Sequence, residues 1–284
     1  MIHIIEIPQI PIGEAIVDII TFLRVNFSTI FDIIRSIISA IVGFFYSTLI
    51  FIPPVVLIAI FALISWKTAK IKVAIFAVVS LLLIISMDLW NATIETLSLV
   101  LVATIIALFI GFPLGILKAR SKAFGAIIEP MLDLMQTLPS LSYLIPAVLF
   151  FRIGVVPGVI ATVIFSMPPA IRLTSLGLEH VSKEMIEVGK SFGATPRQLL
   201  LKIEIPLALP SIMMGVNQTI MLAFSMVVIA GFIGAGGLGE VIISGLQRYN
   251  LVDSIEAGLS IVFLAIILDR VTKQLGKIYD VKKN

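Results

Sequence analysis

Long uncharged runs of mostly apolar residues make up most of the chain. A helix that spans a membrane needs about 20 largely apolar residues, with roughly 17 as the lower limit. Seven runs contain no Asp, Glu, Lys or Arg: 36–66, 73–87, 96–117, 134–151, 153–171, 205–239 and 257–268. The second and the last are short and need flanking polar residues to reach that length. The pattern predicts an all-α polytopic membrane protein with about seven transmembrane helices.

The first run is long, and Pro53 and Pro54 interrupt it. Proline lacks a backbone N–H donor and disfavours a helical conformation in the residue before it. Two interpretations follow. The run is either one helix that starts near Ile50 with an interfacial piece before it, or a re-entrant segment.

A different pattern precedes this run. Polar residues recur in steps of three and four, at Glu14, Asp18, Thr21, Arg24, Ser28, Asp32 and Arg35. This spacing places a narrow polar stripe on an otherwise apolar helix. We expect an N-terminal amphipathic helix that lies in the membrane interface. The alternative is an ordinary helix packed against the bundle.

The 20 Lys and Arg residues predict the orientation. If the chain crosses about seven times, four basic residues remain on one side and all the others fall on the opposite side; the four are Arg24, Arg35, Arg152 and Arg248. Basic residues accumulate on the cytoplasmic side of membrane proteins. We therefore expect a multi-pass protein of the cell membrane with a cytoplasmic C-terminus.

Composition narrows the function classes. The chain is 59% hydrophobic and 13% charged, whereas soluble domains carry about 25% charged residues. A net charge of +3 gives no reason to expect nucleic acid as a partner. The chain has no Cys, which excludes thiolate metal sites, and His3 and His180 are isolated, so we expect no metal site. There is no Gly-x-x-x-x-Gly-Lys-Ser/Thr motif to hold ATP phosphates. The Gly-x-Gly-x-x-Gly spacing of 234–239 follows a span, so close backbone packing explains it better than a nucleotide site.

The segment 172–206 is the longest stretch outside the spans. Ser182 to Lys190 is expected to form a short helix, with Ser182 as N-cap and Glu184 in the first turn. Gly189 and Gly193 allow close backbone approach. On physical grounds this helix is either a docking surface for a cytoplasmic partner or a solvated connector.

The same segment resembles the EAA loop of binding-protein-dependent ABC importer permeases. Glu187-Val188-Gly189, then Gly193, then Ile203-Glu204-Ile205-Pro206 follow that pattern with the same spacing. Val188 and Gly189 replace its two alanines, and Ile205 replaces its leucine. Further segments are similar to the glycine betaine/proline betaine branch of the family: 133–139, 154–158, 167–169 and 217–221.

This resemblance, over about residues 11–270, implies the type I ABC importer permease architecture. It implies a non-catalytic subunit that forms a homodimeric pore, with ATP and Mg²⁺ bound by a separate ATPase subunit and substrate delivered by an extracytoplasmic binding protein. The cargo would be glycine betaine, proline betaine, choline or carnitine, among which the sequence does not choose. We expect residues 1–90 to form a scaffold of the amphipathic helix and two spans, and residues 91–284 to form a five-helix transport core. The implied coupling residues are Glu184, Glu187, Gly189, Gly193, Ala194 and Pro206.

Polar residues within spans tend to face the bundle interior or a cavity. Those that we assign to a translocation path, together with one Met on the same face, are Gln136, Tyr143, Asn217, Gln218, Met221 and Ser225. The alternative role for each polar residue is hydrogen bonding between helices. A secondary transporter would predict inverted repeats and intramembrane ionisable residues, and a membrane scaffold would need no spaced Gly/Pro loop. An importer permease fits the chain better than either.

Overall fold

The computed structural model describes residues 11–281, and within them every regular element is a helix. The N-terminal third contains α1 (Ile12–Asn26), α2 (Ser28–Phe51), α3 (Pro54–Ala69), α4 (Ile71–Ser86) and the long α5 (Trp90–Arg120). The middle contains α6 (Lys122–Thr137), the short η1 (Ser140–Tyr143), α7 (Leu144–Phe151), α8 (Val155–Ser166), α9 (Pro168–Glu179), α10 (Lys183–Ser191) and α11 (Pro196–Leu199). A π-helical turn, η2 (Leu200–Glu204), leads into α12 (Ile205–Ala230), which is followed by η3 (Gly231–Ile233), α13 (Gly237–Gln247) and α14 (Leu251–Val281).

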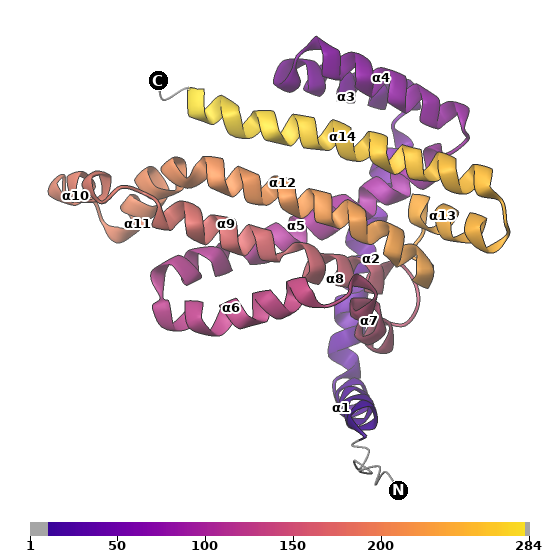
Figure 1. Cartoon of the computed structure of the whole chain (residues 1–284), viewed down its shortest axis with the longest axis horizontal. Coiled ribbons are helices and arrows are strands. Elements are labelled where there is room, and N and C mark those ends of the chain that lie inside the picture. Colours follow the sequence, from indigo (N-terminus) through magenta and orange to yellow (C-terminus); the bar gives the residue numbers. More distant parts are fainter. Residues whose placement is uncertain (1–10, 282–284) are drawn as a thin grey trace, which may run out of the picture.

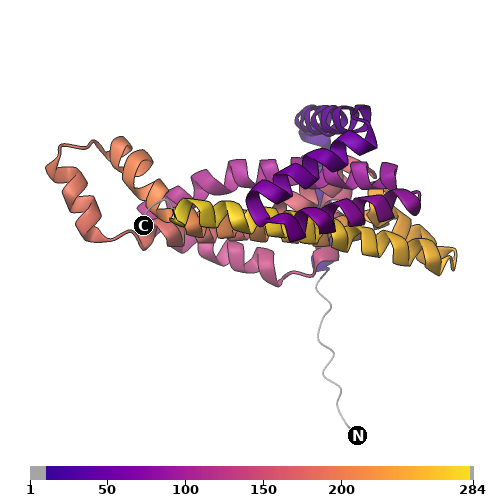
Figure 2. The same ribbon diagram turned by 90° about the horizontal axis from the view of Figure 1, so that it is seen from above.

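The long helices α5, α9, α12 and α14 run along the long axis of the molecule (Figures 1 and 2). Small residues let α5 and α9 approach closely. A Cβ atom built on Gly115 would lie 2.7 Å from Thr174 Cβ, so a side chain at this position would push the two helices apart. Leu97, Phe224, Leu238 and Leu264 are fully buried where α5, α12, α13 and α14 meet. The core therefore lies among the long helices.

Length and composition make five segments able to cross a membrane, namely Ser28–Phe51, Trp90–Arg120, Val155–Glu179, Pro196–Ile233 and Leu251–Gln274. A further pair, Lys122–Thr137 and Ser140–Phe151, bends by 114° and makes a sixth span if it is counted as one. The apolar helices α3 and α4 have 16 residues each. The prediction of an all-α polytopic membrane protein is confirmed. Against the expected count of about seven spans, the described residues contain five or six by length and composition, and α3 and α4 are shorter apolar helices.

The expected N-terminal amphipathic helix is divided in two, because α1 ends at Asn26 and α2 begins at Ser28. Although α2 is long enough to cross a membrane, Figure 1 shows that it runs across the long helices, and Figure 2 shows it nearly end-on. The axis of α2 is therefore roughly perpendicular to the axes of the long helices. The chain breaks at Pro53, so the first uncharged run is divided between the end of α2 and all but the last residues of α3.

Helices α3 and α4 form a hairpin on the outside of the bundle. Lys70, with φ of +75°, makes the turn between them, and both helices pack against α14. Figure 1 shows the hairpin at the edge of the molecule, separated from α6 and α7 by the long helices.

Candidate functional site

The segment between α9 and α12 projects from one end of the bundle (Figures 1 and 2). Its main element, α10, matches the helix expected from Ser182 to Lys190 to within one residue. The Ser182 hydroxyl accepts a hydrogen bond from the Met185 backbone N–H at 3.4 Å, so Ser182 is the N-cap. Glu184 lies in the first turn, where a negative charge favours the helix dipole.

Gly189 is buried and lies where α10 touches the chain that enters α12. A Cβ atom built on it would lie 2.5 Å from Ile203 Cδ1 and 3.1 Å from Leu199 Cδ2. The first of these is the movable end of a side chain, so alanine would fit after a small shift of Ile203. A larger side chain would also meet Leu199 and displace α10.

Gly193 ends α10 by reversing the chain. Its φ is +76°, a left-handed conformation that glycine adopts without strain. The Gly193 N–H donates to the Lys190 carbonyl at 2.9 Å, and the Ala194 N–H donates to the Gly189 carbonyl at 3.1 Å. Thr195 and Gln198 then form a capping box that starts α11. Gly193 and Ala194 therefore fix the direction in which the chain returns to the bundle.

One face of α10 carries exposed apolar side chains. Met185 is 44% exposed, Val188 51% and Phe192 88%. Their spacing of three and four residues places them on the same side of the helix, and we call them the α10 apolar face. The sequence pattern predicted roles for Glu184 and Glu187, which are also exposed, but not for this face. The signal was present as apolar residues at helical spacing in a segment rich in charge.

The returning chain is anchored to α5. Glu204 is 4% exposed, and its carboxylate accepts a hydrogen bond from the Arg120 guanidinium. Pro206 follows in the first turn of α12 and is exposed. The coupling residues predicted from 184 to 206 thus lie along one projecting segment that is tied to the core at Glu204.

The two adjacent polar residues of α12 that we assigned to the path, Asn217 and Gln218, lie on different sides of the helix. The Asn217 side chain is buried and donates to Asp269 Oδ1 of α14 at 3.0 Å, while its Oδ1 accepts from the Thr272 hydroxyl. These are hydrogen bonds between helices, the alternative role considered for such residues. Gln218 is exposed, and its side chain has no hydrogen-bond partner within residues 11–281.

Gln218 belongs to a stripe on α12 that continues through Met214, Met221 and Ser225. Met214, Gln218 and Ser225 are exposed, and Met221 is half-buried. Steps of four, three and four residues place all of them on one side of the helix. The Ser225 hydroxyl donates to the Met221 carbonyl at 3.1 Å, within the same helix. We call these residues the α12 open face.

The remaining two residues of the predicted path lie elsewhere. Gln136 is exposed on α6, and its amide oxygen accepts from Arg172 of α9. Arg172 also pairs with Glu129 at 3.0 Å and with Asp133. Tyr143 is buried, and its hydroxyl donates to the Met135 carbonyl across the bend between α6 and η1. Both side chains therefore have protein partners.

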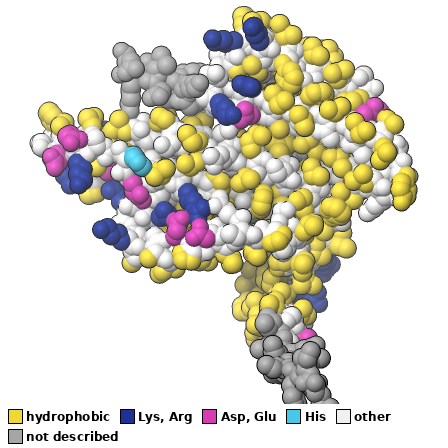
Figure 3. Space-filling view, viewed as in Figure 1, with side chains coloured by type: hydrophobic (Ala, Val, Ile, Leu, Met, Phe, Trp, Pro, Cys, Tyr) yellow, Lys and Arg dark blue, Asp and Glu magenta, His cyan; other side chains and the backbone are white. Residues whose placement is uncertain are grey.

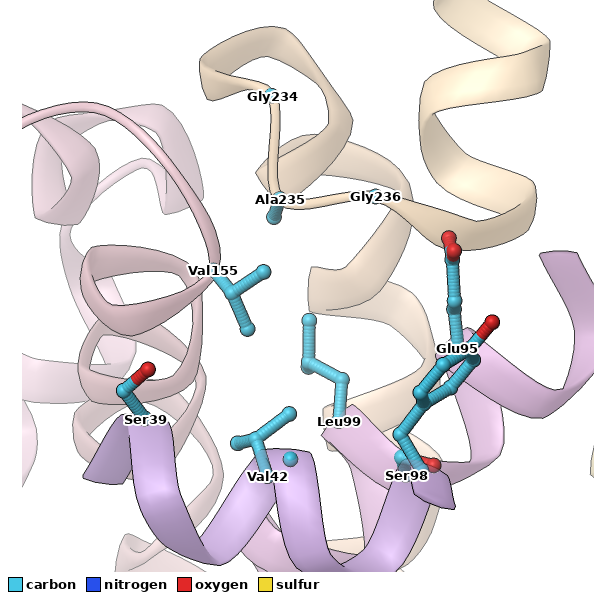
Figure 4. Close-up of a pocket in the computed structure, with 11 residues that line it drawn as sticks. Ser39, Val42, Glu95, Ser98, Leu99, Val155, Gly234, Ala235 and Gly236 are labelled. Atoms are coloured by element: carbon cyan, nitrogen blue, oxygen red, sulfur yellow. The ribbon is translucent and has the colours of Figure 1, made fainter. Parts of the chain in front are cut away.

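A cavity of about 300 Å³ lies between α2, α5 and the glycine-rich turn after α12 (Figure 4). Glu95 stands on its wall and points toward Gly236 in Figure 4, and its Oε2 accepts from the Gly237 N–H at 2.7 Å. Thr96 accepts from the Leu238 N–H at 2.8 Å. The glycine-rich stretch is thus a close contact between α13 and α5.

Comparisons with known proteins agree with this architecture. Residues 111–282 match the family model described as the binding-protein-dependent transport system inner membrane component. This chain belongs to that family. A match of this extent includes the projecting α10 segment and all of α12 and α14.

Three relatives align over nearly the whole chain. The glycine betaine/proline betaine transport system permease protein of Escherichia coli is 44% identical over 94% of this chain and 76% of its own length. The glycine betaine transport system permease protein of Bacillus subtilis is 42% identical, covering 95% and 96%. The glycine betaine/carnitine transport permease protein of Listeria monocytogenes is 46% identical, covering 96% and 98%.

Among solved structures, the MetNI methionine ABC transporter in inward-facing conformations has a similar fold. One crystal form aligns with a TM-score of 0.62 at 22% identity, over 67% of this chain and 95% of the matched chain. A second aligns with a TM-score of 0.60 at 20% identity, over 65% and 93%. This likeness supports the type I permease fold that the sequence predicted.

Proposed function

We propose that this chain is the membrane permease of an ATP-driven importer for glycine betaine or a related small quaternary ammonium compound. The observation that carries the proposal is α10, a short projecting helix with an exposed apolar face in a chain of the binding-protein-dependent family. An apolar face in water is unfavourable until a partner covers it. The partner is an ATPase subunit that binds ATP and Mg²⁺, so the permease itself is not an enzyme.

The orientation follows from the positive charge. In Figure 3, most Lys and Arg side chains gather around α10 and along the upper edge, and the half of this face away from α10 is mostly hydrophobic. Basic residues favour the cytoplasmic side. The α10 end and the C-terminal end of α14 are therefore cytoplasmic, and α13 lies on the side where a substrate-binding protein docks.

The α12 open face is the best candidate for the translocation path. An unpaired amide such as that of Gln218 is costly in lipid, so it belongs against water or a second protein surface. A second copy of the chain facing α12 would enclose a path between two such stripes. Asn217, Gln136 and Tyr143 would support the path from behind, because their side chains are held by other helices.

The first four helices form a peripheral scaffold in this proposal, and the remainder forms the transport core. The α3–α4 hairpin contacts α14 on the outside of the bundle, and the family model begins only at residue 111, within α5. The core would carry the conformational change and the scaffold would hold it in the membrane.

The cargo is proposed from the relatives, whose names specify glycine betaine, proline betaine and carnitine. Each is a small molecule with a permanently charged quaternary nitrogen. The test is uptake of labelled glycine betaine by proteoliposomes that hold this chain, its ATPase and its binding protein. We expect uptake only when ATP is enclosed in the lumen with the ATPase and the binding protein is outside. An excess of unlabelled betaine should compete with the labelled compound. Uptake without the ATPase, or no competition by any quaternary amine, would contradict the proposal.

A further inference from the structure

A groove with unpaired arginines lies between the N-terminal helices and α7. Its volume is about 990 Å³, and its lining includes Arg24 of α1, Asp32 and Arg35 of α2, Val148 and Leu149 of α7, and Arg152 in the turn after α7. We call it the arginine groove. It is distinct from the α10 apolar face and from the α12 open face, and the proposed transport function does not use it.

The charge in the groove is uncompensated. Within residues 11–281, none of Arg24, Arg35 and Arg152 has a side-chain hydrogen bond or an ion pair. Asp32 is the one carboxylate among the lining residues, and it has no ion pair with a described residue. The groove therefore presents a net positive charge to whatever occupies it.

Distant parts of the chain bring these arginines together. Arg152 has φ of +66°, a conformation that costs a non-glycine residue of order 1 kcal/mol or more. Hydrogen bonds hold the turn on both sides, from the Arg152 N–H to the Val148 carbonyl at 2.8 Å and from the Gly154 N–H to the Ile233 carbonyl at 3.0 Å. The fold thus fixes Arg152 against the helices that carry the other two arginines.

The surroundings of the groove are apolar. Ile30, Ile33 and Ile37 of α2 are 52%, 54% and 54% exposed, and Ile153 at the groove itself is 72% exposed. Because α2 runs across the long helices (Figure 1), its polar stripe lies at one depth in the membrane. Three of the four basic residues that the orientation places outside the cytoplasm therefore meet in one place, and only Arg248 lies apart.

We propose that the arginine groove binds the phosphate headgroup of an anionic phospholipid, in the leaflet opposite the α10 end. Guanidinium groups bind phosphate oxygens through paired N–H donors, and the flanking apolar side chains suit the acyl chains. A free anion would use the charge but leave the apolar surroundings without a role. The occupied groove would tie α1 and α2 to α7 at the membrane surface.

The test uses the full-length chain purified with its ATPase and titrated with phosphatidylglycerol, with bound lipids counted by native mass spectrometry. The triple variant Arg24→Gln, Arg35→Gln, Arg152→Gln should bind phosphatidylglycerol at least about tenfold more weakly, since each basic side chain near anionic lipid contributes a factor of roughly five. The matched control is Arg248→Gln, which removes the remaining basic residue of the same side and should leave binding unchanged. Phosphatidylcholine should bind equally to both variants.

A second variant keeps the test decisive if the triple variant does not assemble with its ATPase. Asp32→Asn removes the one negative charge in the groove and should strengthen phosphatidylglycerol binding by about twofold to fivefold. Unchanged binding in both variants would overturn the proposal. Displacement of the lipid by millimolar inorganic phosphate would identify a phosphate site instead, and loss of permease dimers rather than of lipid would identify a subunit contact; either result would also overturn it.

Discussion

Within residues 11–281, helices α10 and α12 each leave one face without a neighbour, and only the face of α12 carries polar side chains. The α10 apolar face consists of Met185, Val188 and Phe192 at the projecting end of the molecule. The α12 open face includes the amide of Gln218, on a helix otherwise packed against α5, α8, α9 and α14. Water disfavours the apolar side chains of α10, and lipid would disfavour the amide of Gln218 on α12.

The contrast teaches how to recognise a functional surface on each side of a membrane boundary. In water, an exposed apolar stripe is unfavourable by about 25 cal/mol per Å² and so indicates a partner. In lipid, an unpaired polar group is unfavourable by several kcal/mol and so indicates a path or a second polar surface. An exposed apolar side chain is therefore informative on α10, and an exposed polar side chain is informative on α12.

The largest effect on transport should come from moving α10 without changing its exposed face. Gly189→Leu would place a side chain against Ile203 and Leu199, at a cost of about 1–3 kcal/mol in local packing. We expect ATP-driven uptake to fall tenfold to a hundredfold while the complex still inserts in the membrane. Uptake in proteoliposomes, normalised to the amount of permease, measures the effect.

Gly189→Ala is the matched control for that experiment. Its Cβ meets only the end of Ile203 at less than 3 Å, and Ile203→Val removes the atom concerned. We expect uptake within about twofold of wild type for Gly189→Ala, and full recovery in the double variant. Equal uptake by the leucine and alanine variants would show that the position of α10 does not matter for coupling.

The next largest effect should come from the α10 apolar face itself. Phe192→Ser should weaken ATPase binding by about tenfold, because burying a phenylalanine side chain contributes roughly 1.5–3 kcal/mol. Thermal stability of the isolated permease should not change, since Phe192 is 88% exposed. Phe51→Ser is the control, because Phe51 is 89% exposed but lies at the end of α2. If both variants bind the ATPase like wild type, the face has another use.

Sequence alone predicted the helices and the projecting segment well. The uncharged runs became helices, Ser182 became an N-cap, and Glu187 and Gly193 lie in the segment that projects from the bundle. These features are local, so the identity and spacing of neighbouring residues determine them.

Other features depend on contacts that spacing does not reveal. The run that became α2 is long enough to span a membrane, but its direction across the long helices depends on packing against α5, which spacing does not reveal. Asn217 and Gln218 are equally polar in the sequence. They differ because Asp269 and Thr272, more than fifty residues further along, meet Asn217 alone.

That difference provides a sharper test of the α12 open face. Asn217→Ala should lower the stability of the permease by about 1–2 kcal/mol, because Asp269 and Thr272 lose a buried partner. Gln218→Ala should leave the melting temperature unchanged and should lower uptake several-fold. Thermal denaturation in detergent and uptake in proteoliposomes separate the two outcomes. The reverse pattern would place the path on the α14 side of α12.

The smallest effect should come from Ser225, although it lies on the same open face as Gln218. Its hydroxyl already donates to the Met221 carbonyl, so the helix itself satisfies the donor and no partner or path is needed. Ser225→Ala should therefore change uptake by less than about twofold and stability by less than about 0.5 kcal/mol. A loss as large as that of Gln218→Ala would mean that the hydroxyl turns toward the cargo during transport. In that case, position on the face, rather than an unpaired polar group, would define the path.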